Sequence, residues 1–168
     1  MSSSLVGSEM CIRDRVRSPG VYFSQEIDKT SDKEVFIGKM IPGRGAWLEF
    51  DTDKRDTLGV RVDRKRRQHI TGFLMALDVI ENKEDAIELL GDYPSVHNTI
   101  ERDPDTTREA ALIDLYRKLR PGEPASVESA RNLVKQMFYT PKRYDLTKVG
   151  RYKVCLLYTS DAADDDVR

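Results

Sequence analysis

The sequence lacks any long apolar run, and its 168 residues include only two cysteines, two histidines and one tryptophan. No stretch approaches the roughly 18 to 20 apolar residues that a membrane-spanning helix needs, and no basic start followed by an apolar segment indicates a signal peptide. We therefore expect a cytoplasmic chain with no membrane partner. With 39% hydrophobic residues, 34% charged residues and a formal net charge of −1, the composition is typical of a globular chain of about one domain.

The two ends differ from the rest of the chain and predict an artificial origin. Residues 1–15 are Ser-rich without periodicity, whereas residues 155–168 run from a short apolar segment into an acidic tail. Residues 10–14 can be encoded by a string whose reverse complement, read one base out of frame, encodes residues 155–159. Such an inverted pair resembles a translated sequencing adapter, so we expect residues 1–15 and 155–168 to be disordered artefacts flanking one domain at 16–154. Natural disordered tails are the alternative.

Both cysteines lie in these two ends, at Cys11 and Cys155. The segment 16–154 therefore holds no candidate disulfide, thiol nucleophile or cysteine-ligated zinc site. The four aspartates of the acidic tail also lie outside it, so the segment is more basic than the whole chain.

The first part of the segment has the alternating pattern of β-strands. Apolar and polar residues alternate over residues 46–50 and again over 58–62, and turn formers separate these runs. Residues 34–41 alternate less regularly, and we place Val35 and Ile37 on their apolar face. The pattern predicts an antiparallel meander with one dry face.

After the last predicted strand, the apolar spacing becomes helical. It predicts a helix after residue 70, one over about 83–90 with Asn82 as its N-cap, one after the capping box that starts at Thr106, and one after Ser126. The predicted fold class is α+β, an antiparallel β meander followed by a small helical cluster.

The sequence shows no self-sufficient active site. Neighbouring carboxylates lie at predicted helix N-termini, where they complement the helix dipole. Neither histidine has a Ser, Asp or second His at the spacing of a triad or a metal site. We predict no catalytic residue, metal or cofactor in this segment.

A basic run and the single tryptophan are the candidate binding residues. Residues 61–67 carry five Arg and Lys side chains, which favour nucleic acid through release of condensed counterions. Trp47 lies out of phase with the apolar face of its strand and could stack on an unpaired base. A solvated turn and a tryptophan at the edge of the core are the alternatives, and the residues alone favour these.

Taken together, five strings in order resemble the β subunit of bacterial DNA-directed RNA polymerase. They are RSPGVYF (17–23), IPGRGAWLEF (41–50), RVDRKRR (61–67), YRKLRPGEP (116–124) and RYDL with VGR (143–146, 149–151). The resemblance covers essentially all of residues 16–154. It implies the lobe of that subunit with the edge of its protrusion, a wall of the DNA channel that acts only within the assembled nucleotidyltransferase.

The resemblance also implies site residues and partners. It implies that Trp47 stacks on a base of the non-template strand near the start site, in a pocket shared with Arg17 and Asp63. The implied DNA-binding residues are Arg17, Trp47, Asp63, Arg64, Arg66 and Arg67. The implied partners are DNA and the β′, α and σ subunits, and the Mg²⁺ of the assembled enzyme is bound by another subunit. Residues 78–107 are divergent, so partner contacts there do not transfer. The alternative is a free-standing nucleic-acid-binding or protein-interaction module without catalysis.

Overall fold

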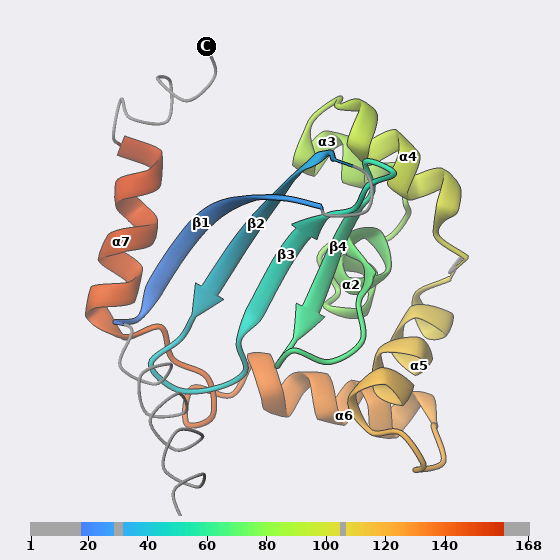
Figure 1. Ribbon diagram of the computed structural model, residues 1–168. Helices are drawn as coiled ribbons and strands as arrows, with labels where there is room; N and C mark the ends of the chain where they lie inside the picture. Colours follow the sequence, from blue (N-terminus) through green and yellow to red (C-terminus); the bar gives the residue numbers. More distant parts are fainter. Residues whose placement is uncertain (1–17, 29–31, 105–106, 160–168) are drawn as a thin grey trace, which may run out of the picture.

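The computed structural model describes residues 18–28, 32–104 and 107–159. Within them, a five-stranded sheet is followed by a set of helices (Figure 1). The strands are β1 (Gly20–Ile27), β2 (Glu34–Ile41), β3 (Leu48–Thr52), β4 (Leu58–Val62) and β5 (Gln68–His69). The helices are α2 (Ile70–Ala76), α3 (Asp85–Leu90), α4 (Pro94–Arg102), α5 (Arg108–Leu119), α6 (Val127–Phe138) and α7 (Thr147–Thr159).

The sheet is an antiparallel meander in the order β1-β2-β3-β4-β5. Helix α2 follows β5 directly and contacts β4, while α5 packs on α2 and α6 packs on α5. Helix α7 returns to the opposite edge of the sheet and lies along β1 (Figure 1). This arrangement confirms the predicted α+β fold.

One face of the sheet, here called the inner face, carries the apolar residues. The register aligns Phe23 with Gly38, Gly38 with Phe50, and Phe50 with Val60. The prediction was correct for β3 and β4, whose apolar residues line this face. It was wrong for β2, because the inner row there contains Phe36, Gly38 and Met40 rather than Val35 and Ile37.

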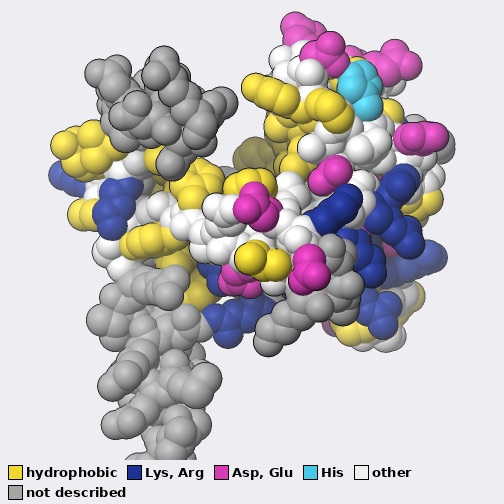
Figure 2. All heavy atoms as spheres, turned by 45° about the horizontal axis from the view of Figure 1, so that its top comes forward, with side chains coloured by type: hydrophobic (Ala, Val, Ile, Leu, Met, Phe, Trp, Pro, Cys, Tyr) yellow, Lys and Arg dark blue, Asp and Glu magenta, His cyan; other side chains and the backbone are white. Residues whose placement is uncertain are grey.

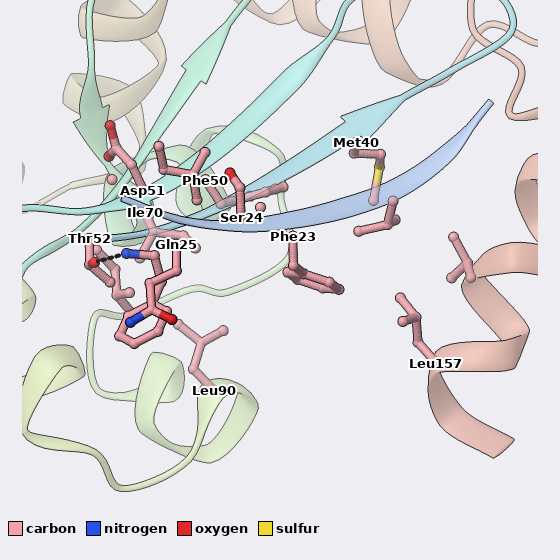
Figure 3. A pocket seen from close by; sticks show the side chains of 17 residues that line it. Phe23, Ser24, Gln25, Met40, Phe50, Asp51, Thr52, Ile70, Leu90 and Leu157 are labelled. Carbon is pink, nitrogen blue, oxygen red and sulfur yellow. Dashed lines mark hydrogen bonds between the residues drawn. The ribbon is translucent and has the colours of Figure 1, made fainter. Parts of the chain in front are cut away.

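The helices cover only the β3–β4 half of the inner face. Val60 is fully buried there, together with Phe73 of α2 and Leu112 of α5. In the β1–β2 half, Phe23 points into a hollow of about 1030 Å³ that is bounded by Leu90 of α3 and Leu157 of α7 (Figure 3). This half of the inner face is therefore not covered by the helices.

The start of α3 differs from the prediction. Asn82 does not cap this helix with its side chain; instead, Asp85 at the first helical position accepts a hydrogen bond through Oδ2 from the Asn82 backbone N–H at 2.9 Å. A carboxylate at a helix N-terminus satisfies exposed donors and complements the dipole. The predicted stop at Gly91 is confirmed, since its φ of 92° is the left-handed conformation that glycine adopts without strain.

The caps of α5 and α6 follow the same physical rule. Ser126 caps α6 as predicted, because its Oγ accepts from the Ser129 backbone N–H at 3.2 Å. For α5 the cap is Thr107, whose Oγ1 accepts from the Ala110 N–H at 3.3 Å, one residue later than the capping box starting at Thr106 suggested. Thr106 itself lies outside the described residues.

The sequence analysis did not predict two of the helices, α4 and α7. Helix α4 begins with Pro94 at its first position, where the missing N–H of proline costs nothing. Helix α7 continues through residue 159, so the beginning of the segment expected to be disordered at 155–168 is helical. The adapter origin of that segment stays a prediction, and residues 1–15 and 160–168 lie outside the described part of the chain.

Candidate nucleic-acid interface

Trp47 and Asp63 are joined by a reciprocal pair of hydrogen bonds. The Trp47 backbone N–H donates to Asp63 Oδ1 at 2.9 Å, and the Asp63 backbone N–H donates to the Trp47 carbonyl oxygen at 2.9 Å. The guanidinium carbon of Arg64 lies 5.4 Å from the centroid of the Trp47 ring, within the range of a cation–π contact. The structure therefore brings together Trp47 and Asp63, which the resemblance placed in one pocket, and adds Arg64 beside them.

A tight turn after β4 presents these side chains. Asp63 and Arg64 have positive φ values of 49° and 59°, and the Lys65 N–H donates to the Val62 carbonyl oxygen at 3.0 Å. Successive positive φ values with this hydrogen bond are typical of a type I′ turn. Aspartate tolerates the left-handed region well and arginine less so, and the bonds to Trp47 compensate for the strain.

A basic groove of about 780 Å³ adjoins this turn. Its lining residues are Arg64, Lys65, Arg66, Asp114, Arg117, Lys118 and Pro121. We call it the α5 groove. The Lys65 Nζ atom donates to the Leu119 carbonyl oxygen at 2.5 Å and thereby ties the turn to the end of α5. Arg66 and Arg117 are exposed, so their charges are accessible to a ligand.

A second basic groove, of about 400 Å³, lies on the other side of Asp63. It is lined by Arg44, Gly45, Ala46, Asp63, Met137, Lys142 and Arg143. We call it the Arg44 groove. The backbones of Arg44 and Asp145 exchange two hydrogen bonds of 3.1 and 2.9 Å, and an Arg44 guanidinium nitrogen donates to the Lys142 carbonyl oxygen at 3.1 Å. The turn at Asp63 and Arg64 therefore adjoins two positively charged grooves, since Asp63 lines one of them and Arg64 lines the other.

Basic side chains are most numerous on one side of the molecule. In Figure 2 the dark blue Lys and Arg side chains are most frequent on the right, the side on which Figure 1 places α4 and α5, and fewer lie at the left and lower centre. Acidic side chains are more frequent toward the top of that view. The charge of the surface is therefore unevenly distributed, although the net charge of the whole chain is only −1.

Arg67 has a different environment from the other arginines of its run. Its Nε donates to Asp51 Oδ1 at 2.6 Å, and an Nη atom donates to the Thr57 carbonyl oxygen at 2.7 Å. The guanidinium packs over Gly59, where an added Cβ would lie 2.2 Å from Nε. Arg67 thus ties the turn to the outer face of the sheet, and the DNA contact predicted for it stays a prediction.

The other predicted site residues fall into two groups. Asp63, Arg64 and Arg66 are exposed and Trp47 is half-buried. Arg17 lies outside the described residues, so its predicted place beside Trp47 stays a prediction. The residues that sequence reasoning missed are Arg44, Arg117, Lys118, Lys142 and Arg143. Most of them lie within the strings that carry the resemblance, but the spacing of these residues in the sequence did not indicate that they line two grooves.

The described residues contain no sign of a catalytic or metal centre. No group of three His, Cys, Asp or Glu side chains able to hold a metal ion is found among them. Burial lowers the pKa of His69, whose Nδ1 atom is buried without a hydrogen-bond partner in this part of the chain. The Tyr116 hydroxyl donates to Glu123 Oε2 at 2.7 Å, and this bond lowers the pKa of Glu123. Both features are structural.

Across the described ranges, no helix is both long and apolar enough to span a bilayer.

Comparison with known proteins identifies the family. The family RNA polymerase Rpb2, domain 2, matches residues 17–166. Proteins named DNA-directed RNA polymerase subunit beta from Renibacterium salmoninarum and Streptomyces avermitilis are each 55% identical to this chain over 139 residues. The corresponding protein from a Nocardioides species is 54% identical over 139 residues. Each match covers 83% of this chain but only 12% of the relative. The chain therefore belongs to the RNA polymerase Rpb2 domain 2 family, and its bacterial relatives are β subunits of DNA-directed RNA polymerase.

Proposed function

We propose that this chain serves as the lobe of an RNA polymerase β subunit, forming one wall of the DNA channel and holding the unpaired non-template strand of a promoter. It contributes to nucleotidyl transfer only in the assembled cytoplasmic enzyme, with the β′, α and σ subunits as partners. The catalytic Mg²⁺ belongs to another subunit. The observation that carries the proposal is that Trp47 is hydrogen-bonded to Asp63, in a turn whose residues Asp63 and Arg64 each line a basic groove.

The chemistry of an unpaired strand fits this arrangement. Proteins that bind single strands combine a positively charged groove along the backbone with aromatic rings on which bases stack. Here the α5 groove supplies Arg66, Arg117 and Lys118, and its residue Arg64 lies 5.4 Å from the centroid of the Trp47 ring. Contacts from these side chains to phosphates position a strand without reading its sequence.

Asp63 has a separate part in the proposal. Its Oδ1 atom accepts from the Trp47 backbone N–H, which fixes the loop that carries the ring. A carboxylate repels phosphates, so the strand is expected to cross this point with a base rather than a phosphate toward the protein. Asp63 can also accept hydrogen bonds from the amino group of a base.

We test the proposal by fluorescence anisotropy of a labelled single-stranded oligonucleotide titrated with the whole chain at several salt concentrations. Trp47→Ala should weaken binding by roughly 1 to 3 kcal/mol, because one stacking contact is lost. Trp47→Phe should weaken binding less than Trp47→Ala does, since a smaller aromatic ring remains to stack on the base. Arg66→Gln should reduce the slope of log K against log salt by about 1.

Lys148→Gln is the matched control, because Lys148 is an exposed cation on α7 and lines neither groove. This variant should bind like the unchanged chain. Equal binding by Trp47→Ala and the unchanged chain would contradict the proposal. It would favour the alternative of a protein-interaction module, whose contact surface would be the uncovered half of the inner face.

A further inference from the structure

A further hollow lies on the helical side of the molecule and shares no lining residue with either groove. It measures about 450 Å³ and is formed by the end of α2, the first turns of α5 and the outer side of α6. Its lining residues are Ala76, Leu77, Asp78, Arg108, Leu112, Arg131, Val134, Lys135 and Tyr139. None of these residues lines the α5 groove or the Arg44 groove. We call this hollow the α6 pocket.

The floor and one wall of the α6 pocket are apolar and fixed. Ala76, Leu112 and Val134 belong to the hydrophobic core and are buried. The ring of Tyr139 is exposed, but its hydroxyl donates to the Leu77 carbonyl oxygen across the pocket. This hydrogen bond restrains an aromatic wall that would otherwise rotate freely, so the pocket is formed before any ligand binds.

The rim of the α6 pocket is positively charged. Arg131 and Lys135 are four residues apart on α6 and are both exposed, a like-charge spacing that destabilises a helix slightly. Arg108 enters from α5, and its Nη1 lies 2.5 Å from Asp78 Oδ1. The lining thus carries three cations and one carboxylate, a net positive charge over an apolar floor.

Arg108 is only partly satisfied by Asp78. Its Nε atom is buried and has no hydrogen-bond partner among the described residues. An arginine presents two donor edges, and here Asp78 occupies the one at Nη1. A buried donor without an acceptor is costly, so a second acceptor at this side chain would be favourable.

We propose that the α6 pocket binds a small organic anion, in which a carboxylate or phosphate group is attached to a planar apolar body. The anionic oxygens would lie among Arg108, Arg131 and Lys135, while the apolar body would lie on Leu112 and Val134 against the Tyr139 ring. The volume lies in the usual range for small-molecule sites, which are apolar with a few charged groups that orient the ligand. This site is independent of the proposed DNA contacts.

The test uses the whole chain and four probes: phenyl phosphate, benzoate, benzyl alcohol and inorganic phosphate. Binding is followed by two-dimensional NMR of the backbone amides. Phenyl phosphate or benzoate should bind at least about tenfold more tightly than benzyl alcohol, because charge-assisted hydrogen bonds require the anion. The amide shifts should centre on Val134 and Tyr139. The order of the two anionic probes identifies which group the pocket prefers.

Two variants separate the charge from the aromatic wall. Arg131→Gln combined with Lys135→Gln should weaken binding of the preferred anion by about tenfold, because charged contacts are lost. Tyr139→Ala should reduce the preference for phenyl phosphate over inorganic phosphate. All three side chains are exposed, so the fold should persist, as circular dichroism would check. Lys148→Gln is the control and should bind as the unchanged chain does.

Several results would overturn this proposal. They are equal binding of benzyl alcohol and the anions, equal binding of inorganic phosphate and phenyl phosphate, unchanged affinity in the double variant, or amide shifts scattered outside the α6 pocket. Any of these results would show that Arg131 and Lys135 are solvated side chains on a helix surface without a ligand-binding role.

Discussion

The two halves of the inner face have similar residues but opposite surroundings. In the β3–β4 half, Leu48 is 7% exposed and Val60 is 0% exposed, because both belong to the core that the sheet forms with the helices. In the β1–β2 half, Phe23 is 72% exposed and Phe36 is 55% exposed. All four side chains point to the same side of one continuous sheet. The apolar pattern of a strand therefore shows which face is dry, but it does not show what covers that face.

The two halves of the inner face also differ in what their apolar surface contributes to, folding stability in one half and association in the other. Burial of apolar area stabilises a fold by about 25 cal/mol per Å², so the covered half contributes to folding and the uncovered half contributes little. An exposed apolar surface of this size indicates an interaction site or a risk of aggregation. The chain spans only 12% of the length of the relatives that it matches.

The largest expected effect compares one residue from each half. Leu48→Ala should lower the free energy of unfolding by about 2 to 5 kcal/mol, since it leaves a cavity under α2. Phe36→Ala should change it by less than about 0.5 kcal/mol, because that side chain is mostly in water. Urea unfolding of both variants measures the two values. Similar losses would show that the two halves do not differ in packing.

The second prediction concerns self-association of the uncovered half. Phe23→Ser combined with Phe36→Ser should reduce concentration-dependent light scattering, because the exposed apolar area becomes smaller. Tyr152→Ser is the control, since Tyr152 is an exposed aromatic residue on α7 and does not line the hollow. If the control reduced scattering as strongly, general surface hydrophobicity would explain the association.

The third and smallest effect extends the comparison to the outer face. Asp51→Ala should lower the free energy of unfolding by about 1 to 3 kcal/mol, because the partly buried Arg67 Nε would lose its hydrogen-bond acceptor. The more exposed Lys39–Glu49 pair, at 3.8 Å, also bridges neighbouring strands on this face. Glu49→Ala should lower the free energy of unfolding by less than about 1 kcal/mol, as is usual for exposed ion pairs. Thermal unfolding distinguishes the two, and equal losses would remove the special role of Arg67.

The sequence predicted β3 and β4 well because their apolar residues alternate regularly. It failed for β2 because Gly38 occupies the inner row, so the strand reads as apolar in both phases. The pairing of Gly38 with Phe23 and Phe50 resolves the phase, and pairing is not visible along a single strand.

The candidate site was only partly predictable, because contacts between distant segments are not visible along the sequence. The basic run at 61–67 was evident, but its members look alike in sequence while Arg66 faces solvent and Arg67 binds Asp51. The link between Trp47 and Asp63 came from the resemblance; their hydrogen bonds show that the two residues are adjacent, and their shared DNA pocket stays a prediction. The bridge from Arg44 to Asp145 joins segments far apart in the chain, which periodicity cannot reveal.

The central claim is that Trp47 stacks on a base of an unpaired DNA strand. Trp47 is the only tryptophan, so the intrinsic tryptophan fluorescence of the chain reports on this one position. Titration with a short single-stranded oligonucleotide should quench that fluorescence as binding saturates. An abasic strand of equal length and charge should bind through its phosphates with little quenching. Unchanged fluorescence at saturation by the base-containing strand would contradict the account.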